Sequence, residues 1–464
     1  MPSGSHMCSP PGEGAAMMPD QVGPGASVNS CPPYRMVWHV LQDTCTVTCA
    51  VDGFDAVLNG SAGRVLELLQ DGMPERIDLS DSGTERFMTA AIAAGWITNR
   101  QLNGKLTRLD HDLGLERIQI EFTTLCNLRC SYCYSESGPT KSSALTLQQV
   151  RGILSEACSL GCTWVDFTGG EFFLYRHWEE ALAFARNLGL VVTIHTNGMA
   201  LTQANVTTLV NRGIRTVQVS LDSHLATVHD AARGMPGALD KTVAGIRRAV
   251  QAGLKVKACV MVHKQNRDAV ADTVRWLNAE IGVPVMLDRI IKAGGELTAA
   301  MGLETREYYE IIAPLIGRNV VSSKICESPA AASGAERRVQ PACGVAHNFV
   351  YITADGEFAL CPTMTSRDRP IFAGPRIAQM GLTQAWLSSY YFNGYRHLNC
   401  ANAGICPAAT KCGGGCRSNA YVETGELTAP DALACNVQKN ATVKFVDFRE
   451  RYAASDYTLP EALR

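Results

Sequence analysis

Long apolar runs are missing from this sequence, and their absence bears first on where the protein resides. The longest apolar run, around residues 190–194, has the length of a strand and is too short to cross a bilayer. A formal net charge of −2 provides no overall field to attract nucleic acid or an anionic membrane surface. No secretory signal is recognisable either. We therefore expect a cytoplasmic protein whose partners include neither nucleic acid nor membrane.

Residues 1–32 lack the pattern of a folded segment. The opening letters "SGSHM" are typical of a cloning remnant, and the stretch after them is rich in Pro and Gly. We expect a tag remnant followed by a disordered tail. The whole chain, 464 residues with 46% hydrophobic and 19% charged residues, has the composition of a globular enzyme with several domains.

Cysteine, in contrast, is abundant, with 18 residues. In a large chain without an export signal, clustered cysteines indicate metal or cluster ligands rather than disulfides. Cys126, Cys130 and Cys133 are spaced C-x3-C-x2-C. Three thiolates can hold three irons of a [4Fe–4S] cube and leave the fourth iron for another ligand. A zinc site completed by a distant residue is the alternative, although zinc loops favour C-x2-C pairs.

Residues 111–320 alternate between strand-like and helix-like patterns. Apolar residues at every second position predict strands at 117–124, 163–169, 190–196, 216–222, 255–263 and 284–292. A helical pattern follows each strand, and four of these helices are expected to end at a glycine. Six such units predict an α/β fold, a partial (β/α)6 TIM-like barrel. Ligands of such sheets bind at the carboxyl ends of the strands.

The motifs at those ends resemble the radical S-adenosylmethionine (SAM) superfamily. They are the cysteine loop with Tyr132 before its third cysteine, and "TGGE", "HTNG", "SLDS" and "HDAARG" after later strands. In that family SAM chelates the open iron and is cleaved to a 5′-deoxyadenosyl radical. The resemblance implies a SAM pocket in which the "GGE" segment binds the amino group, Ser220 lies near the ribose and Arg233 binds the carboxylate. The residues implied are Tyr132, Gly169, Gly170, Glu171, Asn197, Ser220 and Arg233. Four other polar residues at strand ends are expected to have structural roles at least as readily as catalytic ones: His195, Asp222, Asp288 and Arg289.

Residues 321–464 lose periodicity and contain a second cysteine array. Its members are Cys343, Cys361, Cys400, Cys406, Cys412, Cys416 and Cys435, and a hairpin turning at 355–356 is expected between the first two. The array resembles the SPASM extension of radical SAM maturases, which holds two auxiliary [4Fe–4S] clusters and would give three clusters in all. The resemblance assigns the outer cluster to Cys400, Cys406, Cys412 and Cys435, and the inner cluster to Cys343, Cys361 and Cys416. The gap between Cys400 and Cys406 is longer than the family's usual C-x2-C.

Cys326 has three possible roles. It closes the inner cluster as a fourth ligand, or it is not a ligand and that cluster keeps an open iron that could bind substrate. The third possibility is that it acts catalytically by donating a hydrogen atom to a substrate radical. Zinc is the alternative for the whole array, although seven cysteines do not divide into two four-cysteine sites. Cys361 is followed by Pro362, where the sulfatase-maturating branch has an Asp base, so formylglycine formation is not favoured.

Residues 33–110 have a different texture, with strands expected at 34–41 and 44–59 and helices at 61–72 and 84–97. This order predicts a small α+β domain of winged-helix type. The stretch "LNGSAGRVLELLQDG" resembles the PqqD-like domain of peptide-modifying enzymes, which binds a leader peptide as an added strand. A winged-helix domain of another purpose is the alternative.

Together, the resemblances imply a radical SAM maturase that abstracts hydrogen from a ribosomally made precursor peptide bound through its leader. Oxidative cross-linking (C–S, C–C or C–O) is the preferred reaction, because auxiliary clusters can accept the electron left over. An electron donor such as flavodoxin or ferredoxin is implied as a partner. The alternatives are a peptide epimerase, a radical SAM dehydrogenase or maturase acting on a folded protein or small metabolite, and a zinc-binding winged-helix scaffold without enzymatic activity.

Overall fold

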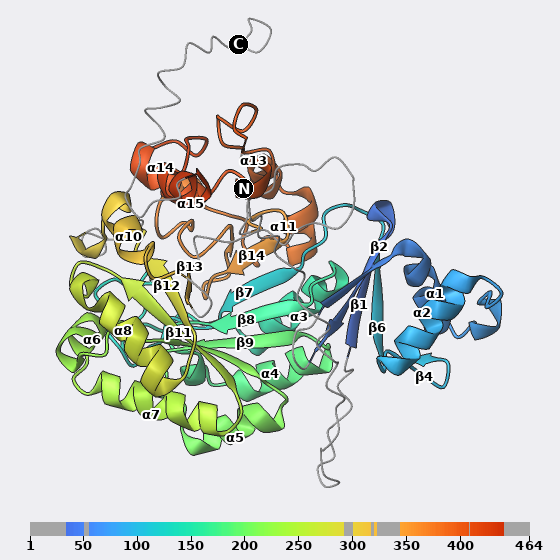
Figure 1. The fold of residues 1–464 in the computed structure, drawn as a ribbon, viewed down its shortest axis with the longest axis horizontal. Helices are drawn as coiled ribbons and strands as arrows, with labels where there is room; N and C mark the ends of the chain where they lie inside the picture. Colours follow the sequence, from blue (N-terminus) through green and yellow to red (C-terminus); the bar gives the residue numbers. More distant parts are fainter. Residues whose placement is uncertain are drawn as a thin grey trace, which may run out of the picture.

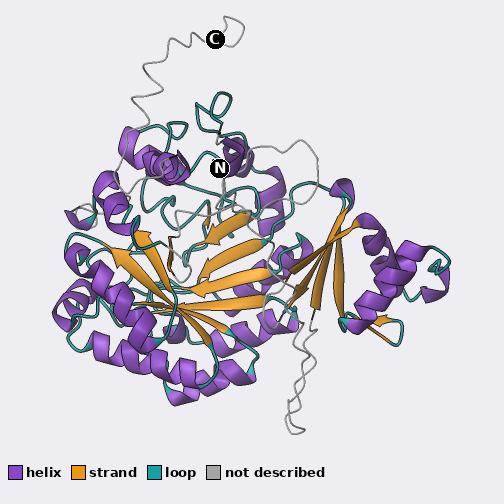
Figure 2. Ribbon diagram, in the orientation of Figure 1, coloured by secondary structure: helices purple, strands orange, loops and turns teal. Residues whose placement is uncertain are grey.

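The computed structural model describes residues 34–50, 55–291, 300–316, 320–322, 344–407 and 409–439. Within them, nine strands form one sheet in the order β13-β12-β11-β10-β9-β8-β7-β14-β15. Helices cover the outer side of this sheet, and the strands lie inside (Figure 2). In the described part of the chain, no helix is both long and apolar enough to cross a membrane.

Six central strands are parallel and follow the predicted positions. They are β7 (Arg117–Glu121), β8 (Trp164–Thr168), β9 (Val191–Thr196), β10 (Thr216–Ser220), β11 (Lys255–Val262) and β12 (Val285–Arg289). Every second residue packs under the helices, as Ile118, Val165 and Val217 do with no exposed surface. The predicted α/β fold with its parallel sheet is therefore confirmed.

The helices of this core also lie where the periodicity places them. They are α3 (Leu147–Ser159), α4 (Trp178–Asn187), α5 (Gln203–Asn211), α7 (Ala238–Gln251), α8 (Val270–Trp276), which continues as a π-helical turn, and α10 (Thr305–Ile312). A capping box between Thr146 and Gln149 begins α3. Glycines with positive φ follow α3, α4, α5 and α7, as expected for helix ends. The additional helix α6 (Ala226–Arg233) falls in the "HDAAR" segment.

The sheet extends beyond the six strands at both edges. Strand β13 (Val320–Ser322) pairs parallel with β12, and β14 (Phe349–Ile352) pairs parallel with β7. Strand β15 (Phe358–Ala359) is antiparallel to β14, so the hairpin expected at 355–356 is present, with Gly356 at φ 84°. An open parallel sheet leaves unpaired edges, and this hairpin covers the one at β7.

The C-terminal segment packs over the barrel mouth at the top of Figure 1. Its helices are α11 (Leu382–Ser388), α12 (Tyr390–Arg396), α13 (Ala409–Cys412), α14 (Arg417–Thr424) and α15 (Ala432–Lys439). Glu156 of α3 accepts a 2.7 Å hydrogen bond from the amide of Thr383, and the Trp386 indole donates to the Leu113 carbonyl at 2.7 Å. The segment is thus bound to the core by polar as well as apolar contacts.

The N-terminal residues form a second sheet, in the order β3-β2-β1-β6. Its strands are β1 (Tyr34–His39), β2 (Thr44–Cys49), β3 (Asp55–Asn59) and β6 (Gly104–Leu109), with helices α1 (Gly60–Gln70) and α2 (Ser82–Ala93) and the hairpin β4 (Ile97–Thr98) and β5 (Gln101–Leu102). The stretch expected as one strand at 44–59 is two strands. The sequence did not predict β6, which returns parallel to β1.

Two buried arginines join this sheet to the barrel, which lies beside it in Figure 1. Arg35 on β1 donates to the carbonyls of Cys158 and Cys162, the latter at 2.6 Å. Arg186 on α4 donates to the carbonyl of Ala50. These charge-assisted hydrogen bonds connect the N-terminal sheet to the core.

Candidate functional site

The three cysteines of the C-x3-C-x2-C motif lie on the loop that follows β7, at the carboxyl edge of the sheet. Burial, with smaller upward contributions from neighbouring thiols, raises the pKa of Cys126 to about 12 and that of Cys130 to about 11. Buried thiols that affect one another's pKa are close together, and as thiolates they need a cation. The loop therefore fits an iron–sulfur cluster.

The "GGE" segment after β8 lies directly against this loop. The Gly170 amide donates to the Thr123 carbonyl at 2.6 Å, and the Glu171 amide donates to the Leu125 carbonyl at 2.9 Å. A Cβ atom on Gly170 would lie 2.5 Å from the Leu125 carbonyl oxygen and 2.9 Å from the Cys126 Cβ. Only glycine allows this approach, because contacts below 3.0 Å force the backbone apart.

Replacing Gly170 by alanine should therefore displace the loop that carries Cys126. We expect the rate of SAM cleavage to fall about 10- to 100-fold, the range seen when the support of a metal ligand is lost, and the iron content to fall by at most about the four atoms of one cluster. Gly138 on the same loop is the matched control, because a Cβ there meets no atom within 4 Å. Iron analysis and chromatography of the cleaved SAM would measure both variants. Equal losses in G170A and G138A would contradict the close approach as the cause.

Glu171 is buried between the carboxyl ends of β8 and β9. Its carboxylate accepts hydrogen bonds from the Thr196 hydroxyl at 2.8 Å and the Asn197 amide at 2.9 Å. Burial raises the pKa of Glu171, and these hydrogen bonds offset only part of the rise. The Asn197 side chain in turn donates to Asn127 Oδ1 at 2.7 Å, next to Cys126. Ser220, at the end of β10, is half-buried.

Arg233 is held beside the cysteine loop. Its Nη2 donates to Asp222 Oδ1 at 2.8 Å, and its Nη1 lies 3.9 Å from the Cys130 sulfur. The guanidinium also lies 5.5 Å from the centroid of the Tyr132 ring, and the Tyr132 hydroxyl donates to the second oxygen of Asp222. Asp222 therefore positions both residues, a role the sequence could assign only as one alternative. The Arg233 Nε is buried without a hydrogen-bond partner in the described residues, which fits a guanidinium awaiting an anionic ligand.

Four cysteines of the second array gather around one hollow in the C-terminal segment. Cys400, Cys406, Cys412 and Cys435 all line it, together with Asp431. Burial raises the pKa of Cys412, with further upward contributions from Asp431, Cys400 and Cys406. These four thiols are the set assigned to the outer cluster, and their convergence fits one.

The remaining ligands are only partly within the described residues. Thr363 Oγ1 lies 3.4 Å from the Cys361 sulfur and donates to Ser418 at 3.0 Å, which connects Cys361 to the start of α14 beside Cys416. Cys326 and Cys343 lie outside the described residues. In the part that is described, no three His, Cys, Asp or Glu side chains form a group that could hold a single metal ion.

A buried ionic network joins the first loop to the C-terminal hairpin, and sequence reasoning missed it. Glu121 on β7 accepts two hydrogen bonds from Arg367, at 2.8 and 3.1 Å, and one from the Tyr351 hydroxyl on β14. Arg367 also donates to Asp355 Oδ1 at 2.9 Å and to the carbonyl of Ser135, two residues after Cys133. In the sequence, the one indication of this network is that Glu121 lies on a strand in which apolar and polar residues alternate.

Cys259 lies on β11, outside both cysteine arrays. It is buried, but Asp288, Asp222, Arg233 and Lys257 are near enough to affect its pKa, which burial raises well above its ordinary value. The thiol thus lies on the inner, polar face of β11, a placement that the strict alternation of Val256, Ala258 and Val260 could have indicated.

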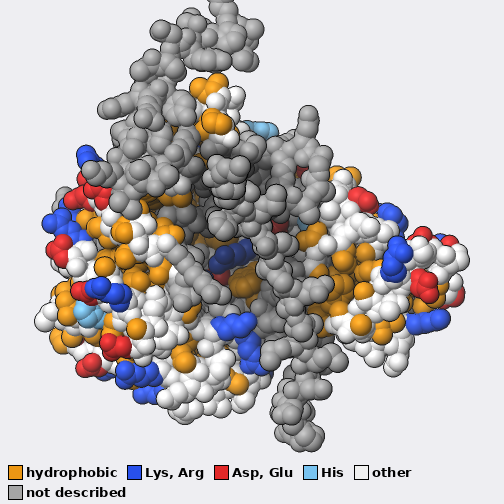
Figure 3. All heavy atoms as spheres, in the orientation of Figure 1, with side chains coloured by type: hydrophobic (Ala, Val, Ile, Leu, Met, Phe, Trp, Pro, Cys, Tyr) orange, Lys and Arg blue, Asp and Glu red, His pale blue; other side chains and the backbone are white. Residues whose placement is uncertain are grey.

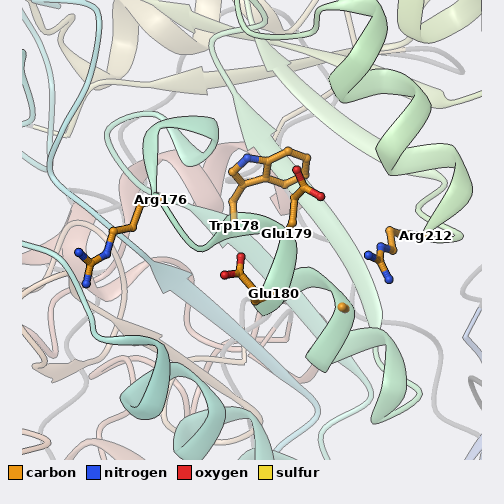
Figure 4. A pocket seen from close by; sticks show the side chains of 6 residues that line it. Arg176, Trp178, Glu179, Glu180 and Arg212 are labelled. Carbon is orange, nitrogen blue, oxygen red and sulfur yellow. The ribbon is translucent and has the colours of Figure 1, made fainter.

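One surface hollow lies away from these residues. It has a volume of about 290 Å³ and is lined by Arg176, Trp178, Glu179, Glu180 and Arg212 on the helical layer. Arg176 and Arg212 lie on opposite sides of the tryptophan and the two glutamates (Figure 4). It contains no thiol and mixes both charges, so it is not a candidate for the cluster chemistry.

Comparisons with known proteins agree with this geometry. Residues 120–277 match the model of the Radical SAM superfamily. Mycofactocin maturase MftC of Mycobacterium tuberculosis is 27% identical over 321 residues, which cover 67% of this chain and 80% of that protein. The AdoMet-dependent heme synthase of Methanosarcina barkeri is 25% identical over 335 residues, 66% of this chain and 92% of that one.

Among solved structures, Streptococcus suis SuiB bound to precursor peptide SuiA has the same fold. Its TM-score is 0.65 at 14% sequence identity, covering 87% of this chain and 98% of that one. The likeness therefore includes the N-terminal sheet or the cysteine-rich segment as well as the barrel, since residues 120–277 are only about a third of the chain.

Proposed function

We propose that this chain, whose residues 120–277 are a radical SAM domain, modifies a ribosomally made precursor peptide by oxidative cross-linking. One observation carries the proposal: a three-thiol loop, a separate four-thiol hollow and an N-terminal sheet with an open edge occur together in one chain. A metabolite-directed enzyme needs the first of these but leaves the N-terminal sheet without a use.

The radical SAM domain implies one [4Fe–4S] cluster and SAM. Cys126, Cys130 and Cys133 would hold the cluster, and when bound the pair supplies a 5′-deoxyadenosyl radical. The chain's own residues orient SAM. Glu171 after β8 and Asn197 after β9 present polar groups at the carboxyl ends of the strands, and Arg233, held by Asp222, presents a guanidinium suited to a carboxylate.

Two auxiliary clusters complete the proposal and bring the total to three. The hollow of four cysteines supports the outer one, and Cys361 with Cys416 supports part of the inner one, for which Cys343 and Cys326 remain proposed ligands. Two such clusters give the single electron left after bond formation a place to go. A reduced flavodoxin or ferredoxin would supply the electron that starts each turnover.

The N-terminal sheet is the proposed site for the leader of the precursor. β3 is an edge strand, and Val57 on it is 62% exposed. An edge strand offers unpaired backbone groups to an extended peptide, and exposed apolar side chains offer it contacts. Basic and acidic side chains both appear over the barrel and over the N-terminal sheet in Figure 3, so no large patch of one sign favours nucleic acid on that face.

Mass spectrometry of a candidate precursor peptide, encoded beside the gene, tests the proposal. The peptide is incubated anaerobically with the reconstituted enzyme, SAM and reductant in deuterated water. We expect the core to lose two hydrogens, and a peptide without its leader to stay unchanged.

If the core instead gained one carbon-bound deuterium and lost no mass elsewhere, the reaction would be epimerisation and not cross-linking. An unchanged peptide together with SAM-dependent change of a small metabolite such as a porphyrin, the substrate class indicated by the heme synthase relative's name, would overturn the peptide as substrate.

A further inference from the structure

The inside of the curved sheet is polar, because the residues that alternate with the apolar core point away from the helices. On β7 to β10 these inner positions include Gln119, Asp166, His195, Gln218 and Ser220. Most are half-buried, whereas Asp166 has no exposed surface at all. A polar interior below the cysteine loop is where a substrate held for hydrogen abstraction would lie.

Asp166 and His195 form a pair on this inner face. Asp166 Oδ2 accepts a hydrogen bond from Arg117, and its Oδ1 lies 3.6 Å from His195 Nε2. Neither Oδ1 nor Nε2 has a hydrogen-bond partner among the described residues, and both atoms are buried. Burial would raise the pKa of Asp166, but Arg117 and His195 outweigh it and lower the pKa to about 2. The carboxylate is therefore ionised at neutral pH beside an imidazole.

No other charged group on the neighbouring strands faces His195. On β10 the inner residues Thr216, Gln218 and Ser220 are uncharged, and on β8 the inner residues besides Asp166 are Trp164 and Thr168. His195 is 19% exposed, in contrast to the full burial of Asp166. With Nε2 turned to the carboxylate, Nδ1 is the nitrogen left for a ligand inside the barrel.

The proposed reaction requires a proton acceptor that nothing above supplies. The substrate C–H bond breaks as its hydrogen atom passes to the 5′-deoxyadenosyl radical. The resulting carbon radical then forms a bond to the sulfur or oxygen of a second side chain. That side chain loses its proton, and one electron passes to an oxidised auxiliary [4Fe–4S] cluster. Pro362 follows Cys361, so no carboxylate stands directly after that cysteine.

We propose that His195, oriented by Asp166, accepts this proton at Nδ1. The inference rests on the proposed cross-linking function. Asp166 is a positioning residue that favours the imidazolium formed by proton transfer, as a buried carboxylate does in other His–Asp pairs. Arg117 keeps Asp166 ionised and fixes its second oxygen.

Substituting His195→Gln in the reconstituted enzyme tests the proposal with the precursor peptide described above. Formation of 5′-deoxyadenosine should persist, while cross-linked product falls about 100-fold, the lower range for loss of a general base. Affinity for the peptide without SAM, followed by fluorescence anisotropy, should stay within about twofold. His177→Gln is the matched control, because His177 lies 3.1 Å from Glu180 on the outer helical layer. It should leave the product yield unchanged.

Asp166→Asn provides the second variant and a pH profile. Removing the negative charge disfavours the imidazolium, so the acid limb of product formation should move to lower pH and the maximum rate should fall. H195Q with wild-type product yield, or D166N with an unshifted limb, would overturn the inference while the cross-linking function stands. A wild-type enzyme that cleaves SAM but forms no cross-link would overturn both. Iron content and the midpoint of thermal unfolding exclude misfolding as the cause in each variant.

Discussion

Replacing Cys130 by alanine should abolish cleavage of SAM. Its sulfur lies 3.9 Å from Arg233 Nη1, and Cys133 is near enough to raise its pKa, so its loss removes a proposed cluster ligand and a neighbour of that arginine at once. Losing a residue that only supports a metal ligand lowers metal affinity or activity about 10- to 100-fold. Losing the ligand itself should therefore lower the rate of SAM cleavage by more than about 100-fold. The measurements are the rate of 5′-deoxyadenosine formation and the iron content per chain. The iron content should fall by about four atoms, those of one cluster.

Two companion variants separate this effect from general damage. Cys49→Ala changes a half-buried cysteine of the N-terminal sheet and should keep both iron and activity. Cys412→Ala, in the four-thiol hollow, should lose iron and cross-linked product while SAM is still cleaved. If C412A lost SAM cleavage as completely as C130A, the division into a radical-generating cluster and auxiliary clusters would be wrong.

Local pattern was enough to predict the core of the fold. Strands β7 to β12 were predictable because their apolar residues alternate, and their helices because apolar spacing of 3.6 ends at glycines such as Gly161 and Gly253. The partners of the two sheet edges were not predictable. β14 pairs with β7 although residue 349 lies opposite residue 117, and no local pattern specifies a neighbour so distant in sequence.

The candidate site divides in the same way. Residues at fixed short spacing, such as Cys126 with Cys130 or Gly170 with Glu171, were visible in the sequence because one loop or turn places them together. Asp222 and Asp166 were not assignable, because their partners Arg233 and His195 come from other elements of the barrel. The roles of Cys326 and Cys343 stay predictions, since both lie outside the described residues.

The Glu121–Arg367 pair offers the second large effect, a loss of stability. Substituting Arg367→Met would leave Glu121, which has no exposed surface, without its cation. Breaking a buried ion pair by removing one partner costs about 3–5 kcal/mol, because the remaining charge is buried unpaired. Arg376→Met is the matched control. Arg376 pairs with Asp355 at 2.9 Å but is 41% exposed, so its loss should cost at most about 1 kcal/mol. The shift in the midpoint of thermal unfolding would measure both.

The sign of the pH dependence identifies Glu121 as the cause. Burial raises the pKa of Glu121, and Arg367 is the largest influence that lowers it again. Without Arg367 the pKa in the folded state rises further above its unfolded value, so the folded state binds a proton that the unfolded state releases. Stability of R367M should therefore fall as the pH rises above about 4.5, the ordinary pKa of a glutamate, and its deficit relative to the wild type should narrow as the pH falls back toward that value. Adding Glu121→Gln to R367M should restore most of the loss at neutral pH, because both charges are then absent. A double variant no more stable than R367M would place the cost in the lost contacts of Arg367 with Asp355 and Ser135 instead.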